Sequence, residues 1–135
     1  MNNFADELEK AVAASKAAIF DLIEHNELLD DDGYPTDAAL DAIKLWHFSD
    51  ARGWFKFIEG LWSKRYGRWT EKQMPRSWAS SKMDTVYDIA TGGWSGCEDI
   101  IRAMQENNHM LWTLNWYQST RGGHYIFVLK EFVAE

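Results

Sequence analysis

The stretch DTVYDIATGGWSGCED, residues 84–99, decides the fold. Its first eight residues, 84–91, are rich in β-branched and aromatic side chains and predict a strand. The glycines at 92, 93 and 96 break that pattern, and residues 95–107 then place Ile100, Ile101 and Met104 at helical spacing. We therefore expect a strand that leads through a tight turn into a helix.

The residues before this stretch show helical periodicity. Within residues 4–26, one face of a helix is marked at intervals of three or four residues by Leu8, Val12, Ser15, Ile19 and Leu22, which are apolar except for Ser15. A second helix is expected at 37–47, after Gly33 and Pro35, with Thr36 as its cap. A third is expected at 50–66, with Ser49 as its cap. Residues 68–83 show no clear period and are expected to be irregular.

The residues after the stretch predict a hairpin. HMLWTLNWYQS (109–119) alternates apolar and polar side chains, RGG (121–123) predicts a turn, and HYIFVLKEF (124–132) predicts a returning strand. Three helices followed by a βαββ unit with a C-terminal antiparallel hairpin indicate an α+β fold. The length of 135 residues fits a single domain, residues 1–135.

Composition excludes several classes of protein. The single cysteine, Cys97, excludes an intrachain disulfide and a cysteine-rich zinc site. The four histidines lack metal-binding spacing, so neither a metal nor a cofactor is expected. The chain has no membrane-spanning apolar run and no signal-peptide pattern at its N-terminus, which predicts an intracellular location without membrane contact.

Charge is unevenly distributed along the chain, whose net charge is −7. Residues 1–45 hold 11 acidic and 3 basic residues, a net charge of −8, whereas residues 46–86 hold 4 acidic and 8 basic residues, a net charge of +4. An acidic chain is a poor general binder of nucleic acid. The acidic surface expected on the first helix consists of Asp6, Glu7, Glu9, Asp21, Glu24 and Glu27.

The predicted order of elements indicates a candidate site. If the first two predicted strands are parallel, the turn at 119–125 lies beside the loop at 91–99. The resulting interaction rim would carry Trp94, Ser95, Arg121, His124 and Tyr125, residue types that are common at protein interfaces.

Four interpretations of TGGWSGCED remain open. The glycines and the helix N-terminus could bind phosphate or a nucleotide with Arg121, although Glu98 and Asp99 oppose an anion there. Cys97 could be a nucleophile with His124 as its base. Ser95 and Glu98 match a capping box, which needs no ligand and which we favour. The same loop could also contact a protein partner through Trp94.

Residues 63–82 offer a separate alternative. They interleave basic and aromatic side chains, as single-stranded nucleic-acid sites do, with Lys64, Arg65, Arg68, Lys72, Arg76 and Lys82 beside Tyr66, Trp69 and Trp78. We favour the simpler interpretation, in which the tryptophans pack in the core and the basic residues pair with the acidic first helix.

The segments TGGWSGCEDII and MLWTLNWYQSTRGGHYIF resemble a group of small bacteriophage and prophage proteins, best over residues 85–130 and more loosely around YPTDAALDAIKLW. The resemblance carries over no catalytic residues. It implies a protein that acts in the cytoplasm of a bacterial host, and by analogy an inhibitor of a host or defence protein, as anti-CRISPR proteins are.

We therefore expect a non-enzymatic accessory protein that binds and modulates a host protein, and a nucleic-acid-binding protein is one candidate partner. The acidic first helix would imitate nucleic-acid charge, or form an oligomer if its apolar face is a seam. The alternative is a nucleotide- or phosphate-binding protein, or an enzyme, that uses the rim between residues 91–99 and 119–125.

Overall fold

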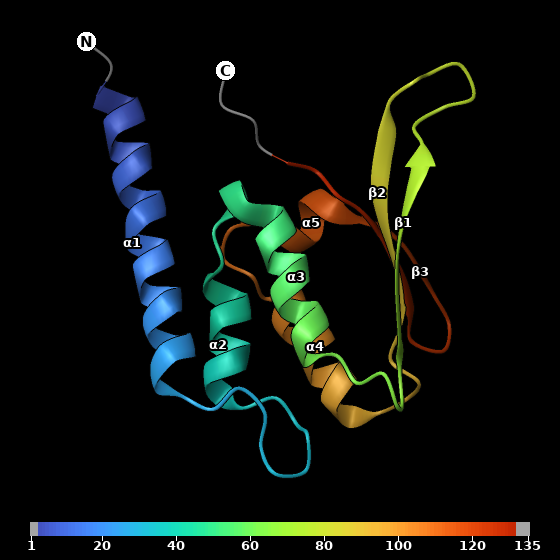
Figure 1. Ribbon diagram of the computed structural model, residues 1–135, viewed down its shortest axis with the longest axis horizontal. Coiled ribbons are helices and arrows are strands. Elements are labelled where there is room, and N and C mark those ends of the chain that lie inside the picture. The colour runs from blue at the N-terminus through green and yellow to red at the C-terminus, as the bar shows by residue number, and fades with distance from the viewer. Residues whose placement is uncertain (1–2, 132–135) are drawn as a thin grey trace.

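The computed structural model describes residues 3–131 and shows the expected α+β architecture (Figure 1). The helices are α1 (Asn3–His25), α2 (Asp37–Leu45), the short 3₁₀ helix η1 (Phe48–Asp50), α3 (Ala51–Leu61), α4 (Ser95–Gln105) and α5 (Leu111–Asn115). The strands are β1 (Arg68–Pro75), β2 (Met83–Ala90), β3 (Trp116–Thr120) and β4 (His124–Val128).

The strands form one sheet in the order β1-β2-β4-β3, and every neighbouring pair is antiparallel. Strands β2 and β3 correspond to the first two predicted strands, and they are not neighbours because β4 lies between them. The C-terminal hairpin is confirmed, with Thr120 opposite His124. The last predicted strand residue, Phe132, lies outside the described residues.

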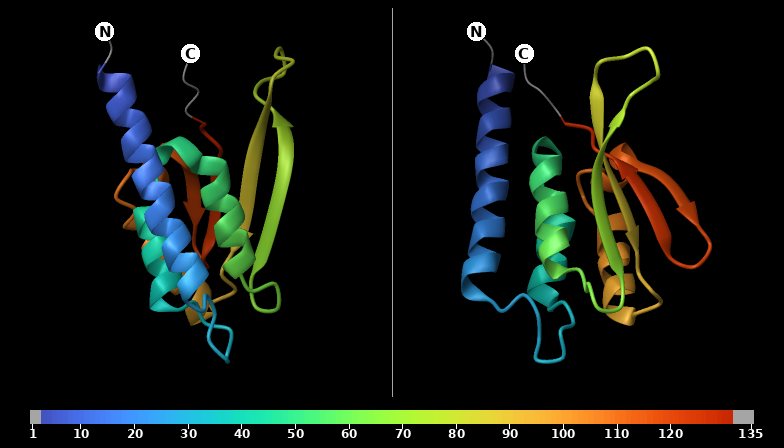
Figure 2. Two further views of the ribbon diagram at one scale, coloured as in Figure 1. Left: turned by 60° about the vertical axis from the view of Figure 1, so that its left-hand side comes forward. Right: turned by 45° about the vertical axis from the view of Figure 1, so that its right-hand side comes forward.

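The core lies between one face of the sheet and the helices. Phe55 of α3 stacks on Tyr87 of β2, with ring centroids 4.2 Å apart, and also contacts Phe127 of β4. Buried residues of α4, such as Ile100 and Met104, belong to the same cluster. Helix α2 packs on α4, and α1 packs on α2. As a result α1 is the outermost helix, at the edge of the molecule far from β1 (Figures 1 and 2).

The helix predictions hold with shorter ends. Thr36 caps α2 as expected, its hydroxyl accepting from the Ala39 N–H, but α2 ends at Leu45 and not at residue 47. Asp50 caps α3 in place of Ser49, because its carboxylate accepts from the Gly53 N–H at 3.2 Å. Helix α3 ends at Leu61 instead of residue 66, where the Trp62 indole donates to the Ala90 carbonyl and anchors the chain to β2.

Strand β1 corrects the prediction that residues 68–83 are irregular. The strand lacks apolar alternation because most of it is exposed: its residues from Glu71 to Pro75 are solvent-accessible on both faces. The distal part of the β1–β2 hairpin extends beyond the helices, so its inward positions have nothing apolar to cover (Figure 1).

The predicted strand 109–119 is wrong over its first half, which forms α5. Buried asparagine side chains favour the helical turn over a strand. The Asn107 carbonyl oxygen accepts from the backbone of His109 and Leu111, at 2.9 and 3.1 Å. Asn115 then donates to the Leu111 carbonyl and accepts from the Lys130 N–H. The alternation of Met110, Trp112 and Leu114 therefore does not report a strand.

None of the helices within residues 3–131 is long and apolar enough to cross a membrane.

Candidate functional site

The two turns of the predicted rim lie side by side, at the end of the sheet where β2 finishes and β4 begins. The Thr91 N–H donates to the Gly123 carbonyl at 2.9 Å, and Ala90 pairs with His124. The turns meet because β4 is antiparallel to both β2 and β3. Strands β2 and β3 therefore run in the same direction, as the prediction supposes, although β4 lies between them. Gly92, with φ of +62°, is approached by the Tyr66 carbonyl oxygen, which a Cβ at this position would overlap. The absence of a side chain at Gly92 thus makes room for the backbone of Tyr66, and this accounts for the glycine without a ligand.

The expected capping box at the start of α4 does not form. Trp94 occupies the N-cap without a side-chain hydrogen bond, and Ser95 is the first helical residue. The Ser95 hydroxyl donates to the Tyr34 hydroxyl at 3.1 Å, and the Glu98 carboxylate accepts from the Thr91 hydroxyl at 3.2 Å. Ser95 and Glu98 therefore do not cap α4. Their side chains bind Tyr34 and Thr91 instead, and so hold the segments that contain these two residues against the start of the helix.

Trp94 lies between two tyrosines. Its ring is 4.8 Å from the ring of Tyr34 and 5.5 Å from that of Tyr66, on which it stacks with an interplanar angle of 24°. The Arg65 guanidinium lies 5.2 Å from the Tyr66 centroid, within the range of a cation–π contact. The indole also covers Gly96, where a Cβ would overlap it. Trp94 is half-buried by these contacts, so only part of its ring faces solvent.

The other rim residues point in different directions. Tyr125 lies on the helix side of the sheet and contacts the Trp112 ring edge-on at 5.8 Å, and burial raises the pKa of its hydroxyl. His124 lies on the opposite, outer face, and Arg121 is exposed in the turn itself. The structure therefore brings Trp94 and Ser95 together with Tyr34, whereas His124 belongs to a different surface.

Cys97 is fully buried, at 0% exposure. Burial raises the pKa of its thiol, and the charge of Glu98 raises it further. The thiolate is the reactive form of cysteine, so both effects oppose nucleophilic chemistry at this position.

The outer face of the sheet, opposite the helices, holds a charge network around Asp88. Its Oδ1 atom is 2.5 Å from Nε2 of His124 and 2.7 Å from the Arg68 guanidinium, while Oδ2 is 3.9 Å from Nζ of Lys72. Nδ1 of His124 lies 3.0 Å from the Thr120 hydroxyl. The network thereby joins all four strands.

The partners of Asp88 control its ionisation. Burial acts to raise the pKa of this carboxyl, but the hydrogen bond and charge of His124, together with Arg68, outweigh it and hold the pKa below the ordinary value. An ionised carboxylate only accepts hydrogen bonds, so Nε2 of His124 carries the proton between them. A hydroxyl–imidazole–carboxylate chain resembles a hydrolase relay, yet here the carboxylate is also held by Arg68 and Lys72, which is typical of a structural network.

Next to this network the outer face is hollowed. The hollow has a volume of about 370 Å³, comparable with small ligand pockets. Val86, Ile126 and Val128 contribute its apolar lining, while Tyr117, Lys72 and Arg76 contribute aromatic and basic groups. Arg76 also donates to Asp84 at 3.0 Å. We call this surface, Lys72, Arg76, Val86, Asp88, Tyr117, Ile126 and Val128, the outer sheet face.

The basic segment 63–82 does not pair with the acidic first helix as expected. Its residues Arg68, Lys72 and Arg76 pair instead with Asp84 and Asp88 on β2. Trp69 packs against Trp62, at 5.7 Å, as a core-facing residue should. Trp78, by contrast, is 99% exposed at the tip of the β1–β2 hairpin. The sequence signal for the outer sheet face was the pair Asp84 and Asp88, which lie four residues apart and therefore on the same face of β2.

The acidic residues Asp6, Glu7, Glu9, Asp21, Glu24 and Glu27 are all exposed. The first five lie on α1 and Glu27 follows its end. The acidic residues of α1 therefore lie at the edge of the molecule opposite the β1–β2 hairpin, whose basic side chains are mostly paired with carboxylates of β2 (Figure 2).

Within residues 3–131 there is no group of three or more histidine, cysteine or carboxylate side chains arranged to hold a metal ion. Comparisons with protein-family models, with curated proteins and with solved structures found no match to this chain.

Proposed function

We propose that this chain is a non-enzymatic binding protein that contacts and modulates another protein through its outer sheet face. One observation carries the proposal: an open hollow lined by apolar and charged side chains lies on the sheet face opposite the described helices (Figure 1). The fully exposed Trp78 follows Arg76, which lines this hollow, by two residues in the same hairpin. Aromatic, methionine and arginine side chains around an apolar centre are the composition of protein-interface cores. Tyr117, Met74 and Arg76 supply these types here.

A protein fits this face better than nucleic acid does. Phosphate binding needs free cationic groups, whereas Asp88 already pairs with Arg68 of β1, and Asp84 pairs with Arg76, which directly follows this strand. The loop at 91–99 is also less suited to a phosphate, because the Tyr66 carbonyl approaches Gly92 and the Trp94 ring covers Gly96. A nucleotide-binding role for the rim therefore receives less support than the outer sheet face.

The acidic edge is a second candidate contact for the same function. Its exposed carboxylates on α1 suit a basic surface, such as a nucleic-acid channel of a host protein. The resemblance to phage proteins supports a search for the partner in the cytoplasm of a bacterial host.

Photocrosslinking from single positions tests the proposal. A benzophenone side chain is placed at Trp78, at Tyr117, at Glu9 on the acidic edge, or at the exposed control position Gln105, and the chain is expressed in host cells. We expect the same protein to be crosslinked from positions 78 and 117, and the yield to fall when Arg76→Glu is added. If crosslinks formed only from position 9, the partner would contact the acidic residues of α1 and not the outer sheet face. Equal crosslinking from Gln105, or crosslinks to nucleic acid, would refute the proposal.

A further inference from the structure

Helix α1 buries very little for its length. It has 23 residues, and within the described helix Asn3–His25 only Ile19 is buried. The other positions of its apolar face, such as Leu8, Val12 and Leu22, are only half-buried against the body. A helix of this length normally obtains its stability from a packed face.

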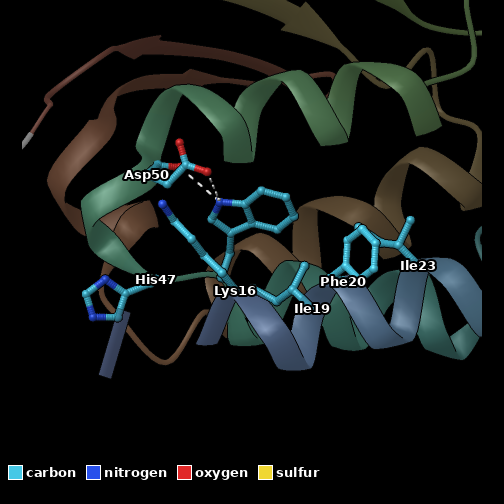
Figure 3. Close-up of a pocket in the computed structure, with 7 residues that line it drawn as sticks. Lys16, Ile19, Phe20, Ile23, His47 and Asp50 are labelled. Carbon is cyan, nitrogen blue, oxygen red and sulfur yellow. Dashed lines mark hydrogen bonds between the residues drawn. The ribbon is translucent and has the colours of Figure 1, made fainter. Parts of the chain in front are cut away.

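An apolar groove separates α1 from α3. Its first part has a volume of about 200 Å³, with Ile19 and Phe20 of α1 on one side and Trp46 on the other. Figure 3 shows Lys16, Ile19, Phe20 and Ile23 along α1, with Asp50 opposite. The second part, about 520 Å³, lies between Ile23 and Phe57 of α3. Ile23 lines both parts, so the two hollows adjoin at this residue.

The groove wall itself carries an apolar side chain that projects outward. Phe20 lines the groove but is 63% exposed. A two-fold symmetric interface must present both a projecting group and the hollow that receives it on one surface. The α1–α3 surface meets that requirement with Phe20 and the groove. Large exposed apolar groups beside an apolar hollow are typical of an interaction site.

We propose that the occupant of the groove is α1 of a second copy of this chain. The two α1 helices lie antiparallel, with Phe20 of each copy inserted in the groove of the other. Together with α3 of both copies they form a four-helix bundle across the two-fold axis. This inference does not rest on the contact proposed for the outer sheet face, although α1 also carries the acidic residues considered above as a second contact.

One pair of opposite charges on the mainly acidic α1 favours this arrangement. Lys16, Phe20 and Glu24 follow one another at intervals of four residues, so they lie along one line of the helix, and all three are exposed. In an antiparallel pair centred on Phe20, Lys16 of one copy faces Glu24 of the other. The symmetry repeats this ion pair twice. A fatty chain or an unrelated helix in the groove would not require this relation between positions 16 and 24.

The oligomeric state of the full chain, measured by sedimentation equilibrium over a wide concentration range, tests the proposal. We expect a reversible dimer, and Phe20→Asp should raise its dissociation constant at least tenfold. Phe4→Asp is the matched control, because Phe4 is 74% exposed on the same helix but does not line the groove. It should leave the constant unchanged. Far-UV circular dichroism checks that each variant is folded.

A charge exchange identifies the register. Lys16→Glu and Glu24→Lys should each weaken the dimer about tenfold, since each replaces two attractions with two repulsions. The double variant should restore the original constant. Within one helix the two positions are about 12 Å apart, so restoration cannot arise inside one copy. A monomeric chain would overturn the proposal, as would a dimer insensitive to Phe20→Asp. A monomer that binds a fluorescent fatty acid in a Phe20-dependent way would assign the groove to a lipid instead.

Discussion

Alanine substitutions at Gly92 and Gly93 separate the effect of backbone conformation from that of close packing. Both glycines have positive φ, +62° and +77°. An L-residue in this region costs about 1–2 kcal/mol, of which about 0.4–1 kcal/mol is offset by reduced entropy of the unfolded chain. A Cβ at position 93 meets nothing within 4 Å. Gly93→Ala should therefore lower the free energy of unfolding by only about 1 kcal/mol.

Gly92→Ala should be clearly worse. Its Cβ would overlap the Tyr66 carbonyl oxygen, which is backbone and cannot rotate away as a side chain can. Overpacking of this kind adds about 1–3 kcal/mol, so the total loss should be about 2–4 kcal/mol. Urea unfolding followed by circular dichroism measures both variants, with the loss taken from the shift in midpoint at constant slope.

Gly60→Ala supplies a control of opposite sign. Gly60 lies in α3 with open space around it, so alanine should stabilise the helix by up to about 1 kcal/mol. Equal losses at positions 92 and 93 would refute the reasoning, since they would mean that the Tyr66 carbonyl does not constrain Gly92. A Gly92→Ala variant that kept full stability would reopen a ligand-binding role for this loop.

Three further predictions concern buried polar groups. Asn107→Ala should lower the free energy of unfolding by about 3–5 kcal/mol, because the His109 and Leu111 N–H groups and the Trp46 carbonyl lose the hydrogen bonds that Asn107 makes to them. The exposed control Asn108→Ala should change the free energy of unfolding by less than about 0.5 kcal/mol in the same urea titration. Burial, together with the charges of His109 and Lys16, lowers the pKa of His47 from its ordinary value of 6.5. Below pH 6.5 the unfolded chain therefore binds a proton that the folded chain does not, so the free energy of unfolding should decrease as the pH falls below 6.5 and be unaffected by His47 above it. If the urea midpoint of His47→Gln fell with pH as much as that of the unsubstituted chain, His47 would not be the cause. Cys97 should react with an aromatic disulfide reagent only as fast as the protein unfolds, and rapid reaction of the native chain would show that its burial is incomplete.

The helices could be predicted because their apolar period matches what the structure buries. The positions Leu8, Val12, Ser15, Ile19 and Leu22 are indeed the less exposed side of α1. Strand β2 was predicted from its β-branched and aromatic side chains, which suit a strand that is largely buried. In these elements one face packs on the core, and the sequence pattern records that contact.

The predictions for β1 and α5 failed because these elements do not show the period of a face packed on the core. Strand β1 overhangs the helices, so its pairing with β2 is made by backbone groups that leave no apolar pattern. Helix α5 depends on the side chains of Asn107 and Asn115, whose partners are up to 64 residues away along the chain. The alternation of apolar and polar residues at 109–119 gives no information on hydrogen bonds to residues so far along the chain, so it could not distinguish this helix from a strand.

The candidate site likewise has one part that could be predicted from the sequence and one part that could not. The meeting of the two glycine turns could be predicted from the order of the elements, and the structure confirms it. The Asp88 network could not, because its groups come from different strands and require the correct register of β1. A strand that is missed removes every cross-strand contact that it makes.

The sparse packing of α1 also affects how the native chain fluctuates. Amide hydrogens in β2 and α4 can exchange with solvent only when the core opens, whereas those in α1 can exchange when the helix detaches or frays. The protein should thus behave as two units of unequal stability, with the outer helix opening many times for each global unfolding event. Anything that packs on α1 would slow that exchange selectively and leave the rates in the sheet unchanged.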